Sequence, residues 1–571
     1  MDNSKSYVFN GNGFLAGHTA LVKRGSGVLA ISNDNTYTGG TRISGGTVSV
    51  NMLSNSTRAY GGLGGVVESA DLFVMENGAT LQTTETVTQG SPMKMEGKDG
   101  GCVENLKDFI VETPVEGTLL TKKGDGWMKL NTVCPSLERL AINGGTVQCV
   151  ACDRPAQTVE FISGTLYENT GSSYAIHVPE GGSGTWSLAN RSTYNNKITG
   201  EGTLTIYCAV EHGNGWFATR TPVAVNLSLF TGTINATADM ADSYPRFTLN
   251  TSSGMPDGTL NITAGVTVQN TGRTFRIGKL AGKGTLGGYA SFANDGATGV
   301  NTWQVGCDDD FAWAGTVTAN SKFEKVGSGK MTVSGVWDNT GEVAVKEGTL
   351  CLNDRSAENA MLGSGELSVE DGAVLCGMGK LGNASVTVER GGRLYSGTRE
   401  GASSGTLDFS GKRLTVSTGG EVLFNVASKV RCTTLEGISS FSLRGTLKVS
   451  VREGLELEAG DEFQLWVANR TAHSSACTLD LDSPGEGLEW DTSALENGIL
   501  KVKTATGITG VVSGEPVDCV VYTLDGARAG SFTCMPSEVG EYMERNGFRS
   551  GMYMVKMTQG QRTESRKVTV D

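Results

Sequence analysis

A chain of 571 residues that contains 81 glycines but only 11 prolines is rich in tight turns and poor in the residue that interrupts strands. Its 47 basic and 60 acidic side chains give a formal net charge of −13, which excludes the extended basic surface that binds nucleic acid or anionic lipid. No apolar run reaches the roughly 18 residues of a membrane-spanning helix. These features predict a folded, β-rich protein with no nucleic-acid partner and no transmembrane segment.

Three segments, at 20–51, 119–150 and 322–354, share one layout: a Gly-x-Gly turn, a short apolar strand, and a later glycine that precedes Thr. In each segment the second glycine of the turn and the glycine before Thr stand 19 residues apart. The pairs are Gly27 and Gly46, Gly126 and Gly145, and Gly329 and Gly348. Three equal spacings indicate a structural repeat.

The alternation of side chains shows what this spacing achieves, because residues i and i+2 of a strand share a face. Leu29 and Ile31 form one apolar face, and Val48 and Val50 repeat that face after 19 residues. A coil with glycine at its corners can return a parallel strand above its neighbour over this distance. The other two copies place Met128 and Leu130 below Val147 and Cys149, and Met331 and Val333 below Leu350 and Leu352. We therefore predict an all-β chain with a right-handed parallel β-helix, a solenoid, over residues 1–505.

These repeats resemble the autotransporter-associated β-strand repeat, which occurs in long, exported, β-helical passengers of bacterial surface proteins. Connecting segments such as FRIGKLAGKGTLGG at 275–288 and GLEWDTSALENGILKV at 487–502 are similar to the same family, so the resemblance covers most of residues 1–505. One departure is Ser396-Gly397, which stands where such proteins often have Pro-Gly. The resemblance implies an extracellular or outer-surface location and offers no catalytic residues to transfer.

The last part of the chain has a different pattern. A small-residue linker at 506–516 precedes residues 517–571, in which apolar side chains alternate on both sides of a turn. The alternating residues are Val520, Tyr522 and Leu524 before the turn and Tyr553, Val555 and Met557 near the end. This pattern predicts a small antiparallel, Ig-like β-sandwich.

The same part resembles the C-terminal sorting domain of type IX secretion in Bacteroidota. The resemblance depends on a V-Y-x-L-D-G opening and a G-x-Y-x-V-K close. The residues that carry it are Asp525, Gly526, Gly551, Tyr553 and Lys556. It implies that the secretion machinery is a partner of this domain and that the chain is anchored at, or released from, the outer surface.

Helical periodicity is confined to two short stretches, 104–108 and 537–545. The first residues, MDNSKSYVFNG, lack the basic and apolar regions of a signal peptide. The repeats also begin within twenty residues of Met1, although the open end of a solenoid needs a polar cap. We therefore expect residues 1–571 to be the C-terminal part of a longer reading frame.

The acidic cluster that could most readily act as a catalytic or binding site comprises Asp308, Asp309 and Asp310. Asp338 joins this cluster if the coils stack as predicted. Grouped carboxylates can bind calcium or divide acid and base roles, and parallel β-helices host polysaccharide lyases and hydrolases. The resembled family, however, fills this loop with acidic and Asn residues, so the favoured interpretation is a solvated turn.

The histidines and cysteines do not have metal-site spacing. His18, His177, His212 and His473 each lie alone in the sequence. Cys149 and Cys152 form a single Cys-x-x-Cys without the second pair of a zinc ribbon, and the stacking pattern places Cys149 in the core. We predict core thiols and no metal or other cofactor; an exported protein could oxidise some of its 12 cysteines, but spacing assigns no pairing.

A further candidate is the segment EHGNGWFATRTPV, which contains Trp216, Phe217 and Arg220. Indole faces stack on sugar rings and guanidinium groups bind hydroxyls or carboxylates, so these residues could contact a glycan. The favoured alternative is that the aromatic side chains cover an open edge of the coil.

Three functional hypotheses remain at this point. The leading one is a non-enzymatic, surface-associated stalk that acts as an adhesin toward glycans or proteins of a host or cell surface. The second is a carbohydrate-active β-helix, which rests on fold analogy alone. The third is a display or transport scaffold for a domain upstream of Met1.

Overall fold

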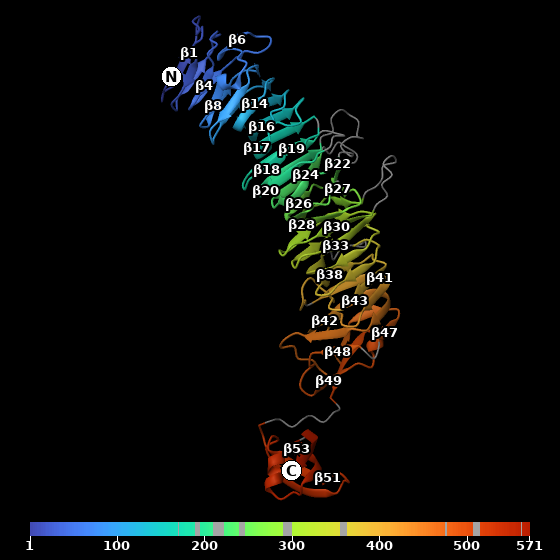
Figure 1. Ribbon diagram of the computed structural model, residues 1–571. Helices are drawn as coiled ribbons and strands as arrows, with labels where there is room; N and C mark the ends of the chain where they lie inside the picture. Colours follow the sequence, from blue (N-terminus) through green and yellow to red (C-terminus); the bar gives the residue numbers. More distant parts are fainter. Residues whose placement is uncertain are drawn as a thin grey trace.

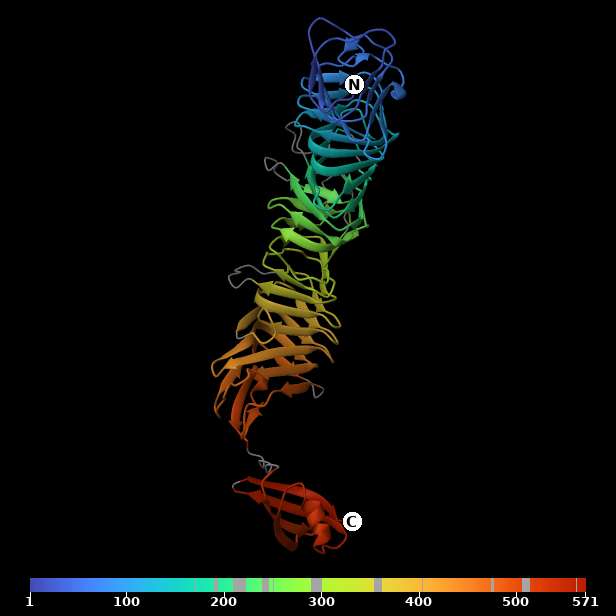
Figure 2. The same ribbon diagram turned by 90° about the vertical axis from the view of Figure 1, so that its left-hand side faces the viewer.

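The structure, a computed structural model, describes most of the 571 residues, and strands stack along residues 1–505 into one long column (Figures 1 and 2). The described residues are 1–169, 171–188, 194–208, 222–238, 246–249, 251–288, 300–353, 362–402, 404–473, 477–505, 514–560 and 562–570. Among the helices in these ranges, none has the length and apolar character needed to cross a bilayer.

The first repeat folds as its alternation predicts. Strand β3 (Val28–Ile31) pairs in parallel with β5 (Thr47–Val50), with Leu29 opposite Val48 and Ile31 opposite Val50. All four side chains are buried. The 19-residue spacing thus places each apolar pair directly above the preceding one.

The other two repeats adopt the same register. Strand β15 (Trp127–Leu130) pairs with β16 (Leu137–Cys149), and β34 (Lys330–Val333) pairs with β36 (Thr349–Asn353). Both pairings are parallel and bring the residues together as predicted. The predicted stacking of all three repeats is confirmed.

Between the repeats, further strands continue the stacks that make up this column. Within a stack, each strand pairs with a strand of the coil before it and a strand of the coil after it. In the N-terminal half of the column, one stack of strands runs through β2 (Leu21–Lys23), β4 (Thr41–Ile43), β8 (Phe73–Glu76), β11 (Met93–Glu96), β14 (Val115–Lys123), β16, β17 (Thr158–Glu168), β18 (Ala175–Val178), β20 (Lys197–Gly200) and β23 (Asn226–Phe230). A second runs through β1 (Tyr7–Phe9), β3, β5, β9 (Ala79–Thr83), β12 (Gly101–Asn105) and β14. A third runs through β10 (Val87–Gln89), β13 (Phe109–Val111), β15, β16, β17, β19 (Ser183–Leu188), β21 (Thr203–Cys208), β24 (Thr233–Ala238), β26 (Met255–Ile262) and β28 (Thr274–Gly282).

The C-terminal half of the column is built in the same way. One series comprises β28, β30 (Asn301–Val305), β33 (Ser321–Lys325), β35 (Val343–Val345), β37 (Leu367–Val369), β39 (Ser385–Val388), β41 (Gly405–Val416), β43 (Arg431–Leu443), β46 (Trp466–Ala468) and β47 (Thr471–His473). Another comprises β31 (Phe311–Trp313), β34, β36, β38 (Val374–Lys380), β40 (Arg393–Ser396), β42 (Glu421–Ser428), β44 (Thr446–Val451) and β48 (Thr478–Leu481). A smaller parallel sheet comprises β22 (Pro222–Val223), β25 (Arg246–Leu249), β27 (Thr267–Asn270), β29 (Thr285–Gly287) and β32 (Thr316–Val317).

Short elements interrupt or end this column. The hairpin of β6 (Tyr60–Gly61) and β7 (Gly64–Gly65) and the 3₁₀ turn η1 (Ala70–Leu72) leave it near the N-terminus. At its C-terminal end, β45 (Glu462–Gln464), β50 (Ile499–Thr504) and β49 (Leu488–Asp491) form an antiparallel sheet with the turn η2 (Leu495–Asn497). The buried side chains of Phe463 and Leu500 join the main core there, so antiparallel pairing ends the parallel stack.

A buried lysine lies at the Gly-x-Gly corner of each repeat. The ammonium of Lys122 donates to three main-chain carbonyls, those of Lys123 at 2.9 Å, Gly124 at 2.6 Å and Gly144 at 3.2 Å. Lys23 and Lys325 make the equivalent three bonds in their repeats. Burial lowers the pKa of Lys122 and of Lys325 to about 8, so both are charged at neutral pH.

The glycine before Thr is required by this corner. Gly46 has a φ of 64°, and a Cβ on it would lie 2.5 Å from the carbonyl oxygen of Gly25 and 2.8 Å from Nζ of Lys23. A larger residue would therefore meet both strain and a direct clash. The spacing that reveals the repeat is fixed by this close approach of two successive coils.

The C-terminal part has a core of its own, separate from the cluster that fills the column. Its strands β51 (Val517–Thr523), β52 (Arg528–Cys534), β53 (Gly551–Gln559) and β54 (Arg562–Val570) form one antiparallel sheet in the order β52-β51-β53-β54. Helix α1 (Val539–Arg545) buries Val539 and Met543 in the same core. The antiparallel pairing was predicted correctly, but within 514–560 and 562–570 the second layer is a helix rather than the second sheet of an Ig-like sandwich.

The two predicted helices have opposite outcomes. The stretch 537–545 contains α1, as expected. The stretch 104–108 was predicted wrongly, because residues up to Asn105 belong to β12, which pairs with β9 on one side and β14 on the other. Two neighbouring strands there outweigh the local preference of a polar segment.

Candidate functional site

The three aspartates of the loop between β30 and β31 are exposed and point to different partners. Oδ1 of Asp308 accepts from Oγ of Ser328 at 2.8 Å, and Oδ1 of Asp310 accepts from the main-chain N of Lys330 at 2.8 Å. Asp309 forms an ion pair with Lys279 at 2.6 Å. Each carboxylate thus joins this coil to the coil before or after it.

This geometry gives the aspartates a structural explanation. Hydrogen bonds from Ser328 hold the pKa of Asp308 below its usual value, which is opposite to the raised pKa of a general acid. Asp338 is exposed, and no hydrogen bond joins its side chain to the three aspartates within the described ranges. The solvated-turn interpretation fits these contacts, and they show no convergent acid–base pair.

The two histidines whose side chains are described each contact a threonine hydroxyl. His18 contacts Oγ1 of Thr38 at 3.2 Å, and His177 contacts Oγ1 of Thr199 at 3.1 Å. His212 and the side chain of His473 lie outside the described residues. In the part of the chain that the structure describes, no three His, Cys, Asp or Glu side chains are grouped to hold a metal ion.

Cys149 and Cys152 are both buried in the main core. Contact with the Cys152 thiol, together with burial, raises the pKa of the Cys149 thiol well above its ordinary value. A thiol that resists ionisation is a poor nucleophile and a poor metal ligand. This environment agrees with the interpretation of a core thiol.

The glycan-contact candidates Trp216, Phe217 and Arg220 lie outside the described residues. The motif of the C-terminal part does lie within them. Gly526 has a φ of 88° in the turn after β51, next to Asp525, whose pKa is lowered by a hydrogen bond from Thr523.

The remaining motif residues are placed on strand β53. Gly551 begins the strand, and Tyr553 is buried, with its hydroxyl donating to the main-chain O of Arg549 at 2.8 Å. Lys556 is exposed. Turn geometry explains Asp525 and Gly526, and core packing explains Tyr553, whereas we find no structural role for Gly551 or Lys556.

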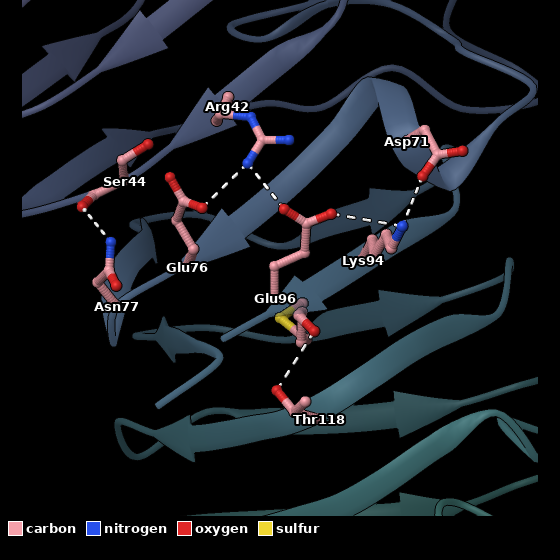
Figure 3. Close-up of polar contacts among 9 residues, drawn as sticks. Arg42, Ser44, Asp71, Glu76, Asn77, Lys94, Glu96 and Thr118 are labelled. Carbon is pink, nitrogen blue, oxygen red and sulfur yellow. Dashed lines mark hydrogen bonds and ion pairs between the residues drawn. The ribbon is translucent and has the colours of Figure 1, made fainter. Parts of the chain in front are cut away.

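A network of charged side chains on the outer face of the N-terminal coils was not predicted from the sequence (Figure 3). Arg42 of β4 binds Glu76 of β8 at 3.0 Å and Glu96 of β11 at 2.8 Å. Lys94 of β11 binds Glu96 at 3.4 Å and Asp71 of η1 at 2.7 Å. The network joins three successive coils, and it could have been anticipated only from outward strand positions that recur at the coil spacing.

The ion pairs of this network stabilise the charged forms of its side chains. The bond to Glu96 raises the pKa of Arg42, and the bond from Arg42 lowers the pKa of Glu96. The bond between Lys94 and Asp71 has the same two effects on that pair. These groups stay ionised near neutral pH, so the network can fix neighbouring coils but is not suited to proton transfer.

Two polar groups inside the column were also missed. Gln89 is buried beside a cavity of about 20 Å³ that Tyr37 and Ser91 also line, and its Oε1 has no hydrogen-bond donor among the described residues. Such a volume accommodates about one water molecule. It is too small for an organic ligand.

Glu168, at the end of β17, is the second of these groups. It lies directly opposite Cys149 in the stack, and one carboxylate oxygen accepts from the hydroxyl of Tyr174, while Oε2 lacks a partner among the described residues. Burial raises its pKa to about 7. The sequence offered no signal, because Glu168 lies outside the three repeats.

Comparisons with known proteins also identify a repeat in this chain. Residues 21–50 match the model of the passenger-associated-transport-repeat family, and this segment contains β2 to β5. The chain is 25% identical over 392 residues to the adhesin BmaC autotransporter of Brucella suis biovar 1 (strain 1330). The match covers 65% of this chain but 10% of that protein, so the chain spans about a tenth of the length of this curated relative. The chain therefore carries an autotransporter-type passenger repeat in a solenoid-like, β-rich column.

Proposed function

We propose that the protein is a surface-exposed, adhesin-like passenger segment that acts as a rigid stalk and has no catalytic activity of its own. The observation that carries this proposal is the series of strand pairings that connects β1 to β48 among the described residues and that includes the passenger repeat at 21–50. A column in which every coil is hydrogen-bonded to the next is stiff along its length. Such a column holds its outer loops away from the cell.

The finer architecture belongs to the same proposal. Residues 1–505 form a right-handed parallel β-helix, 506–516 a linker, and 517–571 a sorting-type domain recognised by the secretion machinery. Parallel pairing at coil spacing supports the first, and the separate core of the last part supports the third. The relative is an adhesin by name, which favours glycans or proteins of a host or cell surface as partners.

Neither alternative function is supported by a site in the described residues. The aspartates at 308–310 bind neighbouring coils instead of converging, which leaves the carbohydrate-active hypothesis without an acid–base pair. The scaffold hypothesis concerns a domain outside this chain.

Protease shaving of intact source cells, followed by mass spectrometry, tests the proposal. We expect peptides from 1–505 among those released, while a cytoplasmic marker protein stays protected until the cells are lysed. Peptides that appear only after lysis, together with the marker, would contradict surface display. Deletion of residues 517–571 should move the chain from the released to the cell-internal fraction; unchanged release would contradict the sorting role alone.

A further inference from the structure

We propose that a recess on the outer face of the column, beside β42 and β44, binds an oxyanion group such as the carboxylate or sulfate of an acidic sugar. The recess has a volume of about 450 Å³, which lies within the range of small-molecule sites. It is open to solvent, so a sugar unit can enter while its chain continues outside. The proposal concerns binding by the isolated protein and does not depend on export.

The floor of the recess is formed by two paired strands. Asn425 of β42 lies directly opposite Ser450 of β44, and both residues line the recess. Asn425 is 5% exposed, and its Nδ2 has no hydrogen-bond acceptor among the described residues. A buried amide donor without an acceptor is uncommon, and rotation of this side chain toward the recess would let a ligand oxygen satisfy it.

One wall of the recess is the loop between β40 and β41, which carries Arg399 and is held on both sides of that residue. Nζ of Lys330 donates to the main-chain O of Thr398 at 2.5 Å. On the other side, Glu400 forms an ion pair with Arg393 at 3.1 Å. The wall is thus positioned before any ligand binds.

Two arginines stand at the rim, Arg399 on the loop and Arg452 just after β44. Both are exposed, and neither side chain forms an ion pair or hydrogen bond within the described residues. Of the acids close to these strands and this loop, Glu400 binds Arg393, and Oδ2 of Asp482 accepts from the main-chain N of Val451, a residue that lines the recess, at 3.0 Å.

This set of groups favours an anion over a neutral sugar. Two guanidinium groups, an amide and a hydroxyl all offer donors, and guanidinium binds carboxylate, sulfate and phosphate oxygens with paired hydrogen bonds. No aromatic side chain lines the recess to stack on a neutral sugar ring. The ligand class is therefore set by charge.

Isothermal titration calorimetry on the full chain tests this assignment with four probes: an oligogalacturonide, a heparin-derived oligosaccharide, inorganic phosphate, and a neutral malto-oligosaccharide. We expect at least one oxyanion probe to bind, with an affinity that falls as salt is raised, and the neutral probe not to bind. Binding of the two acidic sugars alone identifies a glycan-borne group. Equal binding of phosphate identifies a free anion as the ligand of the same site.

Three variants decide whether the recess is responsible. Arg399→Gln and Arg452→Gln should each weaken oxyanion binding at least tenfold, and both are exposed, so the fold should persist. Arg413→Gln removes an exposed arginine of β41 that does not line the recess and should leave the affinity unchanged. Absence of binding by every oxyanion probe, or equal weakening by all three variants, would overturn the assignment.

Discussion

The interior and the outer face of the strand column both carry charges, but they satisfy them differently. Inside, Lys122 has three carbonyl acceptors at a corner that recurs in each repeat, whereas Glu168 has one donor and one unpartnered oxygen. Outside, Arg42 is shared between two carboxylates that water also reaches. The interior side chains should dominate stability, through three hydrogen bonds at Lys122 and an unfavourable charge at Glu168, and the outer charges should matter little.

The largest effect is expected from Lys122→Met. The variant leaves three part-buried carbonyls without their donor, and each buried acceptor left unsatisfied costs about 1 to 3 kcal/mol. The cost should be local, because each coil contacts chiefly its neighbours. Hydrogen exchange of peptides from 119–150 should accelerate strongly in the variant.

Lys123→Met is the matched control, since its side chain is exposed at the same corner. The control should exchange at the wild-type rate. Equal exchange in the two variants would contradict the role of the buried lysine.

Glu168→Gln should stabilise the column in a pH-dependent way. The carboxyl has an ordinary pKa of 4.5 and a folded pKa of about 7, so stability falls as pH rises from 4.5 to 7 and the whole cost is present above 7. The difference corresponds to about 3 kcal/mol at pH 8. The amide keeps an acceptor for Tyr174 without the charge.

The gain from Glu168→Gln should therefore appear in urea unfolding at pH 8 and vanish near pH 4.5. A gain of equal size at both pH values would show that the effect is not one of ionisation. Hydrogen exchange of peptides spanning 158–169 and 171–188 locates the change to these coils.

The sequence predicts the features that are set by residues within one repeat. Strand pairing at the repeats was predictable because alternation and the 19-residue spacing both depend on local residues such as Leu29 and Val48. The buried lysines were also within reach, since a lysine stands two residues before each Gly-x-Gly turn. The sequence does not show that the ammonium turns inward to the carbonyls, which the structure reveals.

Features that depend on how distant coils meet could not be predicted. Glu168 lies opposite Cys149 only because β16 and β17 pair, and a register irregularity interrupts that pairing. The recess requires the path of the loop that carries Arg399 as well as the alignment of β42 with β44. Neither arrangement produces a periodic pattern in the amino-acid sequence.

A smaller effect is expected on the outer face. Arg42→Gln breaks both ion pairs of that side chain, but the pairs are partly exposed, and such pairs contribute about 1 kcal/mol or less. The loss should shrink further as salt is raised, because solvent ions screen it. Urea unfolding at low and high salt measures this dependence.

Arg444→Gln provides the control for Arg42, since its exposed side chain has no ion pair among the described residues. A salt-independent loss in the Arg42 variant would indicate lost packing along its stem rather than lost charge.

The smallest effect is expected from Asp309→Asn, which removes the ion pair with Lys279 at a fully outward position. Stability should not change measurably, and neither should any reaction with polysaccharide, because the carboxylates of Asp308 and Asp310 are already committed to Ser328 and Lys330. Release of oligosaccharides from acidic polysaccharides by the wild type, abolished in this variant, would reverse that conclusion. It would mean that the three acids, which join coils in the resting structure, converge on a bound chain, and the outer face would then be a catalytic surface as well as a support.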